Sequence, residues 1–165
     1  MNPTSIIERI VAAPVGSDLE AAMQARGEIL RLSQASHDAV VTPKDPGGFT
    51  HMERAALAER MARHNESLPL AAHYRALLDG AAATDALTAV ASNGPTPALD
   101  TRFAAVVRFT DLVTLRPRDA QRADIDSLKE AGVTEPDIVR LTELIAFVNY
   151  QVRVIAGFKL AGEVQ

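Results

Sequence analysis

Residues 135–160 constrain the fold of this chain more than any other segment. Their apolar side chains recur on nearly every side of a helical wheel, not along a single stripe. A helix of that kind is stable in water only when several other elements surround it. We therefore predict a helical domain that packs around this segment. Its apolar residues are Ile138, Leu141, Leu144, Ile145, Phe147, Val148, Val152, Ile155 and Phe158.

Every other long segment also has the spacing of a helix, and strand-like alternation is nowhere sustained. Ala, Leu, Glu, Arg and Gln dominate these segments, and all five are good helix formers. Two prolines and a glycine pair predict a loop at residues 42–48. The predicted helices span residues 6–12, 17–41, 50–65, 67–80, 83–91, 99 or 100 to 116, 124–131 and 135–160.

Three of these helices begin with a capping box, in which a Ser or Thr and an acidic residue three positions later cap each other's backbone amides. The pairs are Ser17 with Glu20, Thr50 with Glu53, and Thr134 with Asp137. For the helix at 17–41 we also predict one inner face at a spacing of three to four residues. That face consists of Ala21, Ala25, Ile29, Leu32, Ala35, Ser36 and Ala39 or Val40.

Length and composition set bounds on the class of protein. We assign the 165 residues to one domain, because that length suffices for a single buried core. A net charge of −4 provides no electrostatic footprint for nucleic acid or an anionic membrane. The sequence shows no signal-peptide pattern and no uninterrupted apolar run of about 18 residues, so we predict a cytoplasmic protein without a membrane partner. It contains no cysteine, which excludes disulfides, thiolate catalysis and cysteine-ligated metal.

A polar break separates two helical segments, and we expect a functional site there. It consists of Asn65, Glu66 and Ser67, with Pro69 tolerated in the first turn of the second helix. Ser67 is interpreted first as the N-cap of that helix, and alternatively as a nucleophile beside His73. His73 is either a packed histidine that bonds a backbone carbonyl or a proton shuttle near the helix start.

Metal binding at this break would draw on His64, Glu66 and His73. Their spacing matches no recognisable ligand pattern, so we predict no metal and no cofactor. The arginines of the same region are interpreted as solvated helix faces or as interface ion pairs of small energy. They are Arg60, Arg63 and Arg75.

A polar stripe runs along the otherwise apolar final helix. At about 100° per residue, its members fall within one sector of the helix surface. Buried polar groups must be paired, hydrated or placed at an interface. The stripe is therefore an internal hydrogen-bond network, a subunit contact or a ligand-facing surface. Its residues are Glu143, Asn149, Tyr150 and Arg153.

The order of several segments carries a family resemblance. Glu53 and Arg54 lie in a helix that ends at Asn65, a short polar break follows, and His73 stands in Ala-Ala-His-Tyr. Residues 132–138 have the form of a turn into a last helix. In these features the chain resembles the alkylhydroperoxidase D-like proteins, which share a superfamily with carboxymuconolactone decarboxylases. Two further segments carry the same resemblance: residues 47–54, Gly-Gly-Phe-Thr-His-Met-Glu-Arg, and residues 144–153, Leu-Ile-Ala-Phe-Val-Asn-Tyr-Gln-Val-Arg. The resemblance covers roughly residues 28–160 and is strongest to the peroxidase-related branch. It implies an all-α, alkylhydroperoxidase D-like helical bundle.

Redox enzymes of that family carry a Cys-x-x-Cys pair at the start of the second site helix, a His just after it and a Glu one turn into the preceding helix. The helix N-terminus lowers the thiol pKa, and Glu and His relay the proton. An alignment on Asn65 places Ser67 and Leu70 at the cysteine positions, whereas an alignment on the histidine places Glu66 and Pro69 there.

The family's glutamate position falls on Ala55, with Glu53 two residues away, and His73 is retained. The resemblance without the thiols implies a non-redox member that lacks thiol peroxidase activity. It would bind a small molecule or perform acid–base chemistry near His73. The alternatives are a non-catalytic oligomeric scaffold, or a decarboxylase or isomerase of a small acidic lactone with Arg153 or Arg75 as the basic residue.

These expectations name specific residues and partners. Family members form trimers or hexamers, so we expect a homo-oligomer, with no nucleic-acid or membrane partner. The candidate catalytic residues are His73, Glu53 and Ser67, and the candidate ligand-binding residues are Asn65, Glu66, Asn149 and Arg153.

Overall fold

The computed structural model describes residues 5–80, 83–94 and 99–163. Within these ranges the chain forms helices and no strand, so the all-α prediction is confirmed. The helices are α1 (Ile6–Val11), α2 (Asp18–Ala25), α3 (Gly27–Val41), α4 (His51–His64), α5 (Leu68–Asp79), α6 (Asp85–Ala91), α7 (Thr101–Leu115), the short 3-10 helix η1 (Pro117–Asp119), α8 (Arg122–Glu130) and α9 (Glu135–Glu163).

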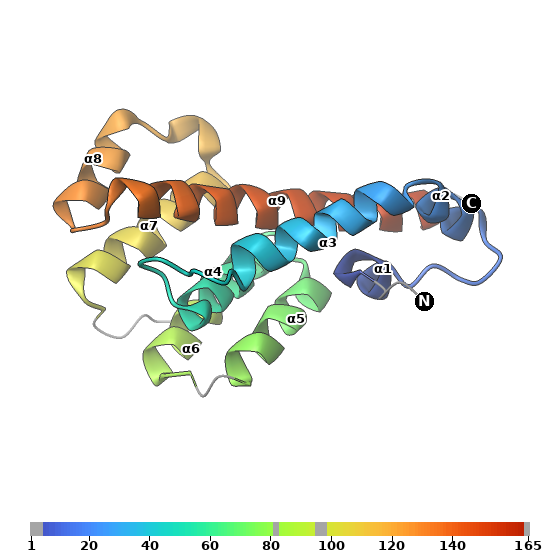
Figure 1. Ribbon diagram of the computed structural model, residues 1–165, viewed down its shortest axis with the longest axis horizontal. Helices are drawn as coiled ribbons and strands as arrows, with labels where there is room; N and C mark the ends of the chain where they lie inside the picture. The colour runs from blue at the N-terminus through green and yellow to red at the C-terminus, as the bar shows by residue number, and fades with distance from the viewer. Residues whose placement is uncertain (1–4, 81–82, 95–98, 164–165) are drawn as a thin grey trace.

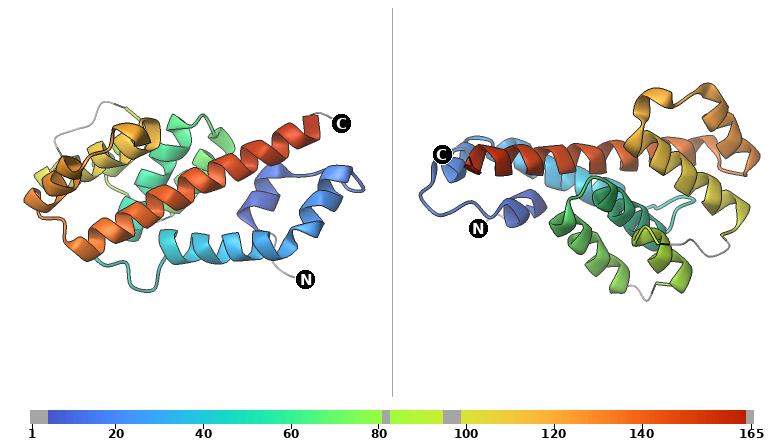
Figure 2. Two further views of the ribbon diagram at one scale, coloured as in Figure 1. Left: turned by 90° about the horizontal axis from the view of Figure 1, so that it is seen from above. Right: turned by 180° about the vertical axis from the view of Figure 1, so that it is seen from behind.

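Helix α9 is the central element, as the sequence predicted. It runs the length of the molecule, with α1 and α2 beside its C-terminal end and α7 and α8 beside its N-terminal end (Figure 1). Helices α3 and α4 also pack against it, and α5 and α6 pack against α4 (Figure 2). Helix α9 is long and apolar enough to cross a membrane, but the core helices of soluble proteins meet the same two criteria of length and composition. Because α1, α2, α3, α4, α7 and α8 all pack against α9, we interpret it as the core helix of the bundle.

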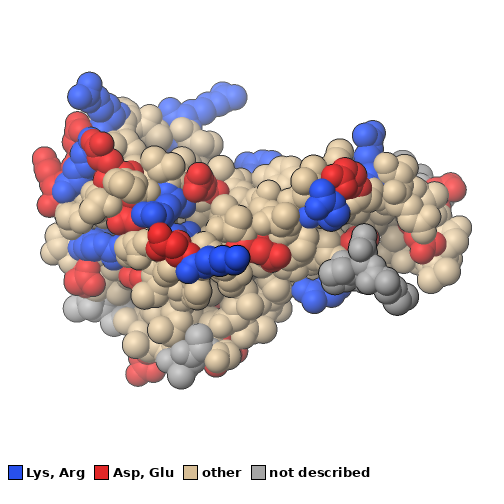
Figure 3. Space-filling model, viewed as in Figure 1, with Lys and Arg blue, Asp and Glu red and all other residues tan. Residues whose placement is uncertain are grey.

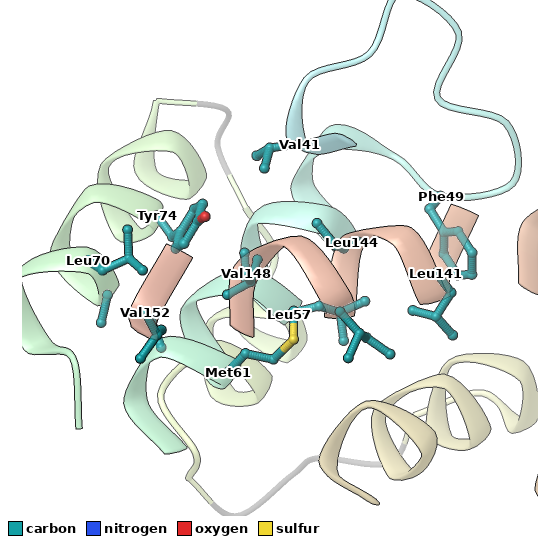
Figure 4. Packing of buried hydrophobic residues seen from close by; sticks show 14 of the residues in the cluster. Val41, Phe49, Leu57, Met61, Leu70, Tyr74, Leu141, Leu144, Val148 and Val152 are labelled. Carbon is teal, nitrogen blue, oxygen red and sulfur yellow. The ribbon is translucent and has the colours of Figure 1, made fainter. Parts of the chain in front are cut away.

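The core lies between α9 and α4. Leu144 and Val148 of α9 and Leu57 and Met61 of α4 are buried, and Figure 4 shows them on facing sides of the two helices. Helix α4 is buried over most of its length, which its small side chains permit because they let neighbouring helices approach closely. The buried small residues are Ala55, Ala56, Ala58 and Ala62.

The prediction of one continuous helix at residues 17–41 is wrong in two respects. It is divided at Arg26 into α2 and α3, where a glycine, a poor helix former, begins the second helix. Its predicted inner face is displaced, because Ile29 and Leu32 are each 50% exposed. The buried positions of α3 include Ser33 and His37, which have polar partners inside the bundle. The inner face is thus not the most apolar one, and an apolar pattern could not identify it.

Of the three predicted capping boxes, one is complete and two form in part. At α9 the Asp137 amide donates to the Thr134 hydroxyl, but the Asp137 carboxylate accepts from that hydroxyl and not from the Thr134 backbone amide. Thr50 and Glu53 form the complete reciprocal box at the start of α4. Ser17 accepts from the backbone amide of Glu20, but the Glu20 carboxylate accepts from Gly16 and not from Ser17. Helix α1 has a further box, between Ser5 and Glu8, that we did not predict.

The 42–48 loop is attached to the start of α9. Asp137 accepts from the side chain of Thr134 at 2.7 Å and from the backbone amide of Gly48 at 2.9 Å. Arg140 donates to the same carboxylate at 3.0 Å. This cluster holds the start of α4 against the start of α9. It therefore also determines the position of the polar break, which follows the other end of α4.

Candidate functional site

The break between α4 and α5 is a tight helix stop. Ser67 donates its backbone amide to Ala62 at 2.8 Å, and Glu66 donates to Arg63 at 3.0 Å. This pair of bonds forms a Schellman motif, which requires a left-handed residue, usually glycine, just past the helix. Glu66 occupies that position with φ +57°. Ser67 stands at the predicted N-cap of α5, but its ψ of 71° differs from the extended value of a cap and its side chain makes no capping bond.

Asn65 and Asn149 meet across this break. The Asn65 side chain donates to Asn149 Oδ1 at 3.2 Å and to the Met61 carbonyl at 2.9 Å. Asn149 donates in turn to the Ile145 carbonyl at 2.9 Å, and Arg153 donates to the Asn149 carbonyl at 2.7 Å. The stripe on α9 is therefore partly an internal hydrogen-bond network, which was one of its interpretations.

The other two members of the stripe lie elsewhere. Tyr150 contacts Ser33 of α3, with 2.8 Å between the two hydroxyl oxygens, and Glu143 is exposed.

A cavity of about 150 Å³ opens at the break. Asn65, Glu66 and Ser67 line it, so the structure brings three of the candidate residues together. The opposite wall is α9, which contributes Lys159, a cation that we did not single out. Lys159 lies on the same face of α9 as Val152 and Ile155, and this face lines the cavity. A lysine near the end of a helix is common, so the sequence did not indicate this role. The remaining lining residues are Pro69, Val152, Ile155 and Ala156.

His73 lies further along α5, beside a second histidine. The two Nε2 atoms of His73 and His37 are 3.3 Å apart, and His37 Nδ1 is 3.3 Å from Asp38 Oδ1. Because a carboxylate only accepts, His37 carries its proton on Nδ1 when neutral, and His73 donates from Nε2. Burial is the main cause that lowers the pKa of His73 to about 4, and the neighbouring His37 and Arg9 add to it.

The low pKa keeps His73 neutral at pH 7. Burial also lowers the pKa of His37 and raises that of Tyr74, which donates to Gln151 at 2.6 Å. His73 is not among the residues that line the cavity at the break, and within the described chain no hydrogen bond joins it to Ser67. His73 therefore bonds an imidazole and not a backbone carbonyl, which was one of its two interpretations.

Glu53 is separated from the other candidates. Its Oε2 accepts from the backbone amide of Thr50 at 2.7 Å, and its Oε1 lies 3.4 Å from Arg102. It stands at the first turn of α4, whereas the break follows the last turn, about 20 Å away for a helix of this length. The grouping of Glu53 with His73 and Ser67 in one pocket is thus not what the structure shows.

Arg60 was interpreted as a solvated or interface residue, and that interpretation is wrong. It is buried and donates to both carboxylate oxygens of Asp111, from Nε at 2.6 Å and from Nη2 at 2.7 Å. His64 Nε2 contacts the same carboxylate at 3.0 Å. Asp111 lies on α7, and no local pattern joins it to α4, so the sequence could not reveal the pair.

Arg63 and Arg75 are likewise intramolecular partners. Both pair with Glu59, which is fully buried in α4, at 2.7 Å and 2.9 Å respectively. Arg75 therefore pairs with Glu59 and is not free to face an acidic substrate. His64, Glu66 and His73, considered above as metal ligands, also have separate surroundings. Among the described residues no group of three or more His, Cys, Asp or Glu side chains is arranged to hold a metal ion.

Comparison with solved structures identifies the fold. An uncharacterized peroxidase-related protein from Ralstonia eutropha JMP134, described as an alkylhydroperoxidase AhpD core, superposes with a TM-score of 0.70 at 23% identity over 86% of this chain and 78% of its own. An uncharacterized peroxidase-related protein from Silicibacter sp. TM1040 gives a TM-score of 0.66 at 15% identity over 94% and 90%. No family model matches the sequence. No curated protein matches it either.

The chain therefore has the alkylhydroperoxidase D-like fold. The resemblance seen in the sequence is confirmed at that level. The chain is a cysteine-free example of a fold that its solved neighbours, described as peroxidase-related, also have.

Proposed function

We propose that this protein is a non-redox member of the alkylhydroperoxidase D-like superfamily that binds a small molecule at the break between α4 and α5. The position of this break in the fold supports the proposal. The resemblance places the family's thiol pair at the start of α5, at Ser67 and Leu70 in one alignment and at Glu66 and Pro69 in the other. None of these side chains can form a disulfide or a thiolate.

The observation that carries the proposal is the cavity lined by Asn65, Glu66, Ser67 and Lys159. A cavity of about 150 Å³ is large enough for a ligand of the size of benzene. The side chain of Ser67 makes no capping bond, so no side-chain cap offsets the positive end of the α5 helix. The Lys159 ammonium and this helix end together offset the Glu66 carboxylate in the lining, so we expect the site to favour a small anion, such as a short carboxylic acid.

Binding of propionate tests the proposal, with γ-butyrolactone as the uncharged counterpart. We expect saturable shifts in the amide NMR spectrum at residues 65–70 and 152–159, and a Lys159→Ala variant that binds propionate about tenfold more weakly. Lys44→Ala is the matched control, because Lys44 does not line the cavity. Equal binding of propionate by the two variants, or no shift at the break, contradicts the proposal.

A second candidate function is an oligomeric scaffold without catalysis. Ile29 and Leu32 of α3 and Phe147 and Tyr150 of α9 line an open apolar groove of about 580 Å³. A third, a decarboxylase or isomerase of a small acidic lactone, requires a basic, positively charged residue that faces the acidic substrate. Lys159 is better placed for that role than Arg153, which is exposed and bonded to the Asn149 carbonyl.

A further inference from the structure

A larger cavity lies between α4, α7 and α8, away from the break. Its volume is about 550 Å³, within the range of roughly 300–1,000 Å³ that holds small organic ligands. Most of its wall is apolar and comes from α7, with one arginine from α4 and one aspartate from α8. The lining residues are Arg60, Leu99, Ala104, Val107, Arg108, Asp111, Leu112, Leu115, Arg116 and Asp124.

One polar part of this wall is already saturated. Asp111 accepts two bonds from Arg60 and one from His64, and Arg60 also donates to the Val90 carbonyl at 3.0 Å. The amide of Asn93 lies 3.3 Å from His64 Nδ1. Because an amide N–H only donates, His64 accepts at Nδ1 and donates from Nε2 to Asp111. The Arg60–Asp111 pair is therefore a fixed, neutral part of the wall and not the group that binds a ligand.

Two cations remain available in the same cavity. Arg108 makes no ion pair or side-chain hydrogen bond with the described residues, and it is exposed. Among the residues that the structure describes, the Arg116 guanidinium has one ionic contact, a long one of 3.8 Å to Asp119. Apart from Asp111, the acidic residue in the lining is Asp124, and one of its carboxylate oxygens caps the start of α8 by accepting from the Gln121 amide at 2.8 Å. The free charge in the cavity is therefore positive.

Apolar walls and free guanidinium groups together define a class of ligand. We propose that this cavity binds a small organic anion with an apolar body, such as a medium-chain monocarboxylate. The body packs against Val107, Leu112 and Leu115, and the carboxylate bonds to Arg108 and Arg116, whose guanidinium groups match it in geometry. This cavity shares no lining residue with the one at the break, so a failure of one binding proposal would not contradict the other.

Three probes with the same body and different head groups test the inference: octanoate, octan-1-ol and octylammonium. Titration of the full chain, followed by amide NMR, is expected to show saturable shifts in α7 and α8 with octanoate. Octanol should bind about tenfold more weakly, and octylammonium more weakly still. Arg108→Ala is expected to lower the octanoate affinity to near that of octanol.

Two controls make the outcome decisive. Arg118→Ala removes a neighbouring exposed arginine that does not line the cavity and should leave the octanoate affinity unchanged. Leu112→Asp places a negative charge in the apolar wall and should abolish octanoate binding while Lys159→Ala does not. Equal affinities for octanoate and octylammonium, an affinity unchanged by Arg108→Ala, or octanoate shifts confined to the break would each overturn the inference.

Discussion

At the scale of single residues, the helix stop at Glu66 shows best how local chemistry shapes the candidate site. Its left-handed backbone, φ +57°, is one that glycine adopts readily and that other residues adopt at a cost of about 1 kcal/mol. The sequence correctly predicted the break, because polar residues interrupted the helical pattern there. It could not predict the left-handed position, because glutamate is an ordinary helix former.

Glu66→Gly is expected to raise the free energy of unfolding by about 0.5–1 kcal/mol, since it removes the backbone strain. Glu143→Gly is the matched control. It makes the same change on the exposed side of α9, where glycine should lower stability by about 1 kcal/mol. Urea unfolding of the two variants measures both values, and a destabilised Glu66→Gly would show that its side chain, not its backbone, decides its contribution.

His73 predicts how stability depends on pH. Its pKa is about 4 in the folded chain, against about 6.5 when unfolded. Between these values the unfolded chain binds more protons, so the free energy of unfolding falls as the pH falls from 6.5 toward 4. One such group contributes at most about 1.4 kcal/mol per pH unit, and less here because the ring is only half-buried.

His73→Gln should therefore flatten the decline of stability between pH 6.5 and 4.5. Urea midpoints across that pH range measure the effect. An unaltered slope in His73→Gln would mean that the folded chain tolerates the His73 charge.

At the scale of elements, caps and helix spacing predicted most of the helices, and tertiary contacts decided the rest. The reciprocal pair of Thr50 and Glu53 is local in sequence, and it formed as predicted. The orientation of α3 was mispredicted because Ser33 and His37 find polar partners on α9 and α5. Arg60 was misread for the same reason, because its partner Asp111 lies on another helix. Such pairings leave no trace in a local pattern.

Gly48 links two elements, and its replacement should disturb both. A Cβ added there would meet the Asp137 carboxylate, which is buried and held by Thr134 and Arg140. Gly48→Ala should therefore destabilise the chain by about 1–3 kcal/mol.

The control for that change is Gly157→Ala in α9, where an added Cβ meets nothing within 4 Å. In a helix this substitution should stabilise by about 0.5–1 kcal/mol. Thermal unfolding of both variants provides the comparison. A neutral Gly48→Ala would show that the 42–48 loop yields without loss of its contact to α9.

At the scale of the whole molecule, the central position of α9 followed from its apolar surface on all sides. The fold class followed from the absence of strand patterns. The surface charge is mixed, as the small net charge of −4 indicated, since basic and acidic side chains are interspersed over the end of the molecule formed by α7 and α8 (Figure 3). The site could be predicted only in part. Asn65, Ser67 and Asn149 lie together, whereas Glu53 and His73 lie apart from them.

Self-association is the whole-molecule prediction. The groove between α3 and α9 exposes Ile29, Leu32 and Tyr150, and an apolar surface of that kind is typical of a subunit contact. We expect a homo-oligomer that Ile29→Glu dissociates, whereas Val15→Glu, at an exposed residue outside the groove, leaves it intact. Light scattering coupled to size exclusion distinguishes these states. A wild-type monomer at high concentration would exclude the contact.

The central claim is that a fold shared with peroxidase-related proteins is retained here without thiol chemistry. Peroxide consumption by the purified chain, supplied with a dithiol donor, tests that claim most directly. We expect a rate equal to that of buffer with donor alone, because no residue of the chain can form a thiolate. Sustained turnover proportional to the protein concentration would contradict it.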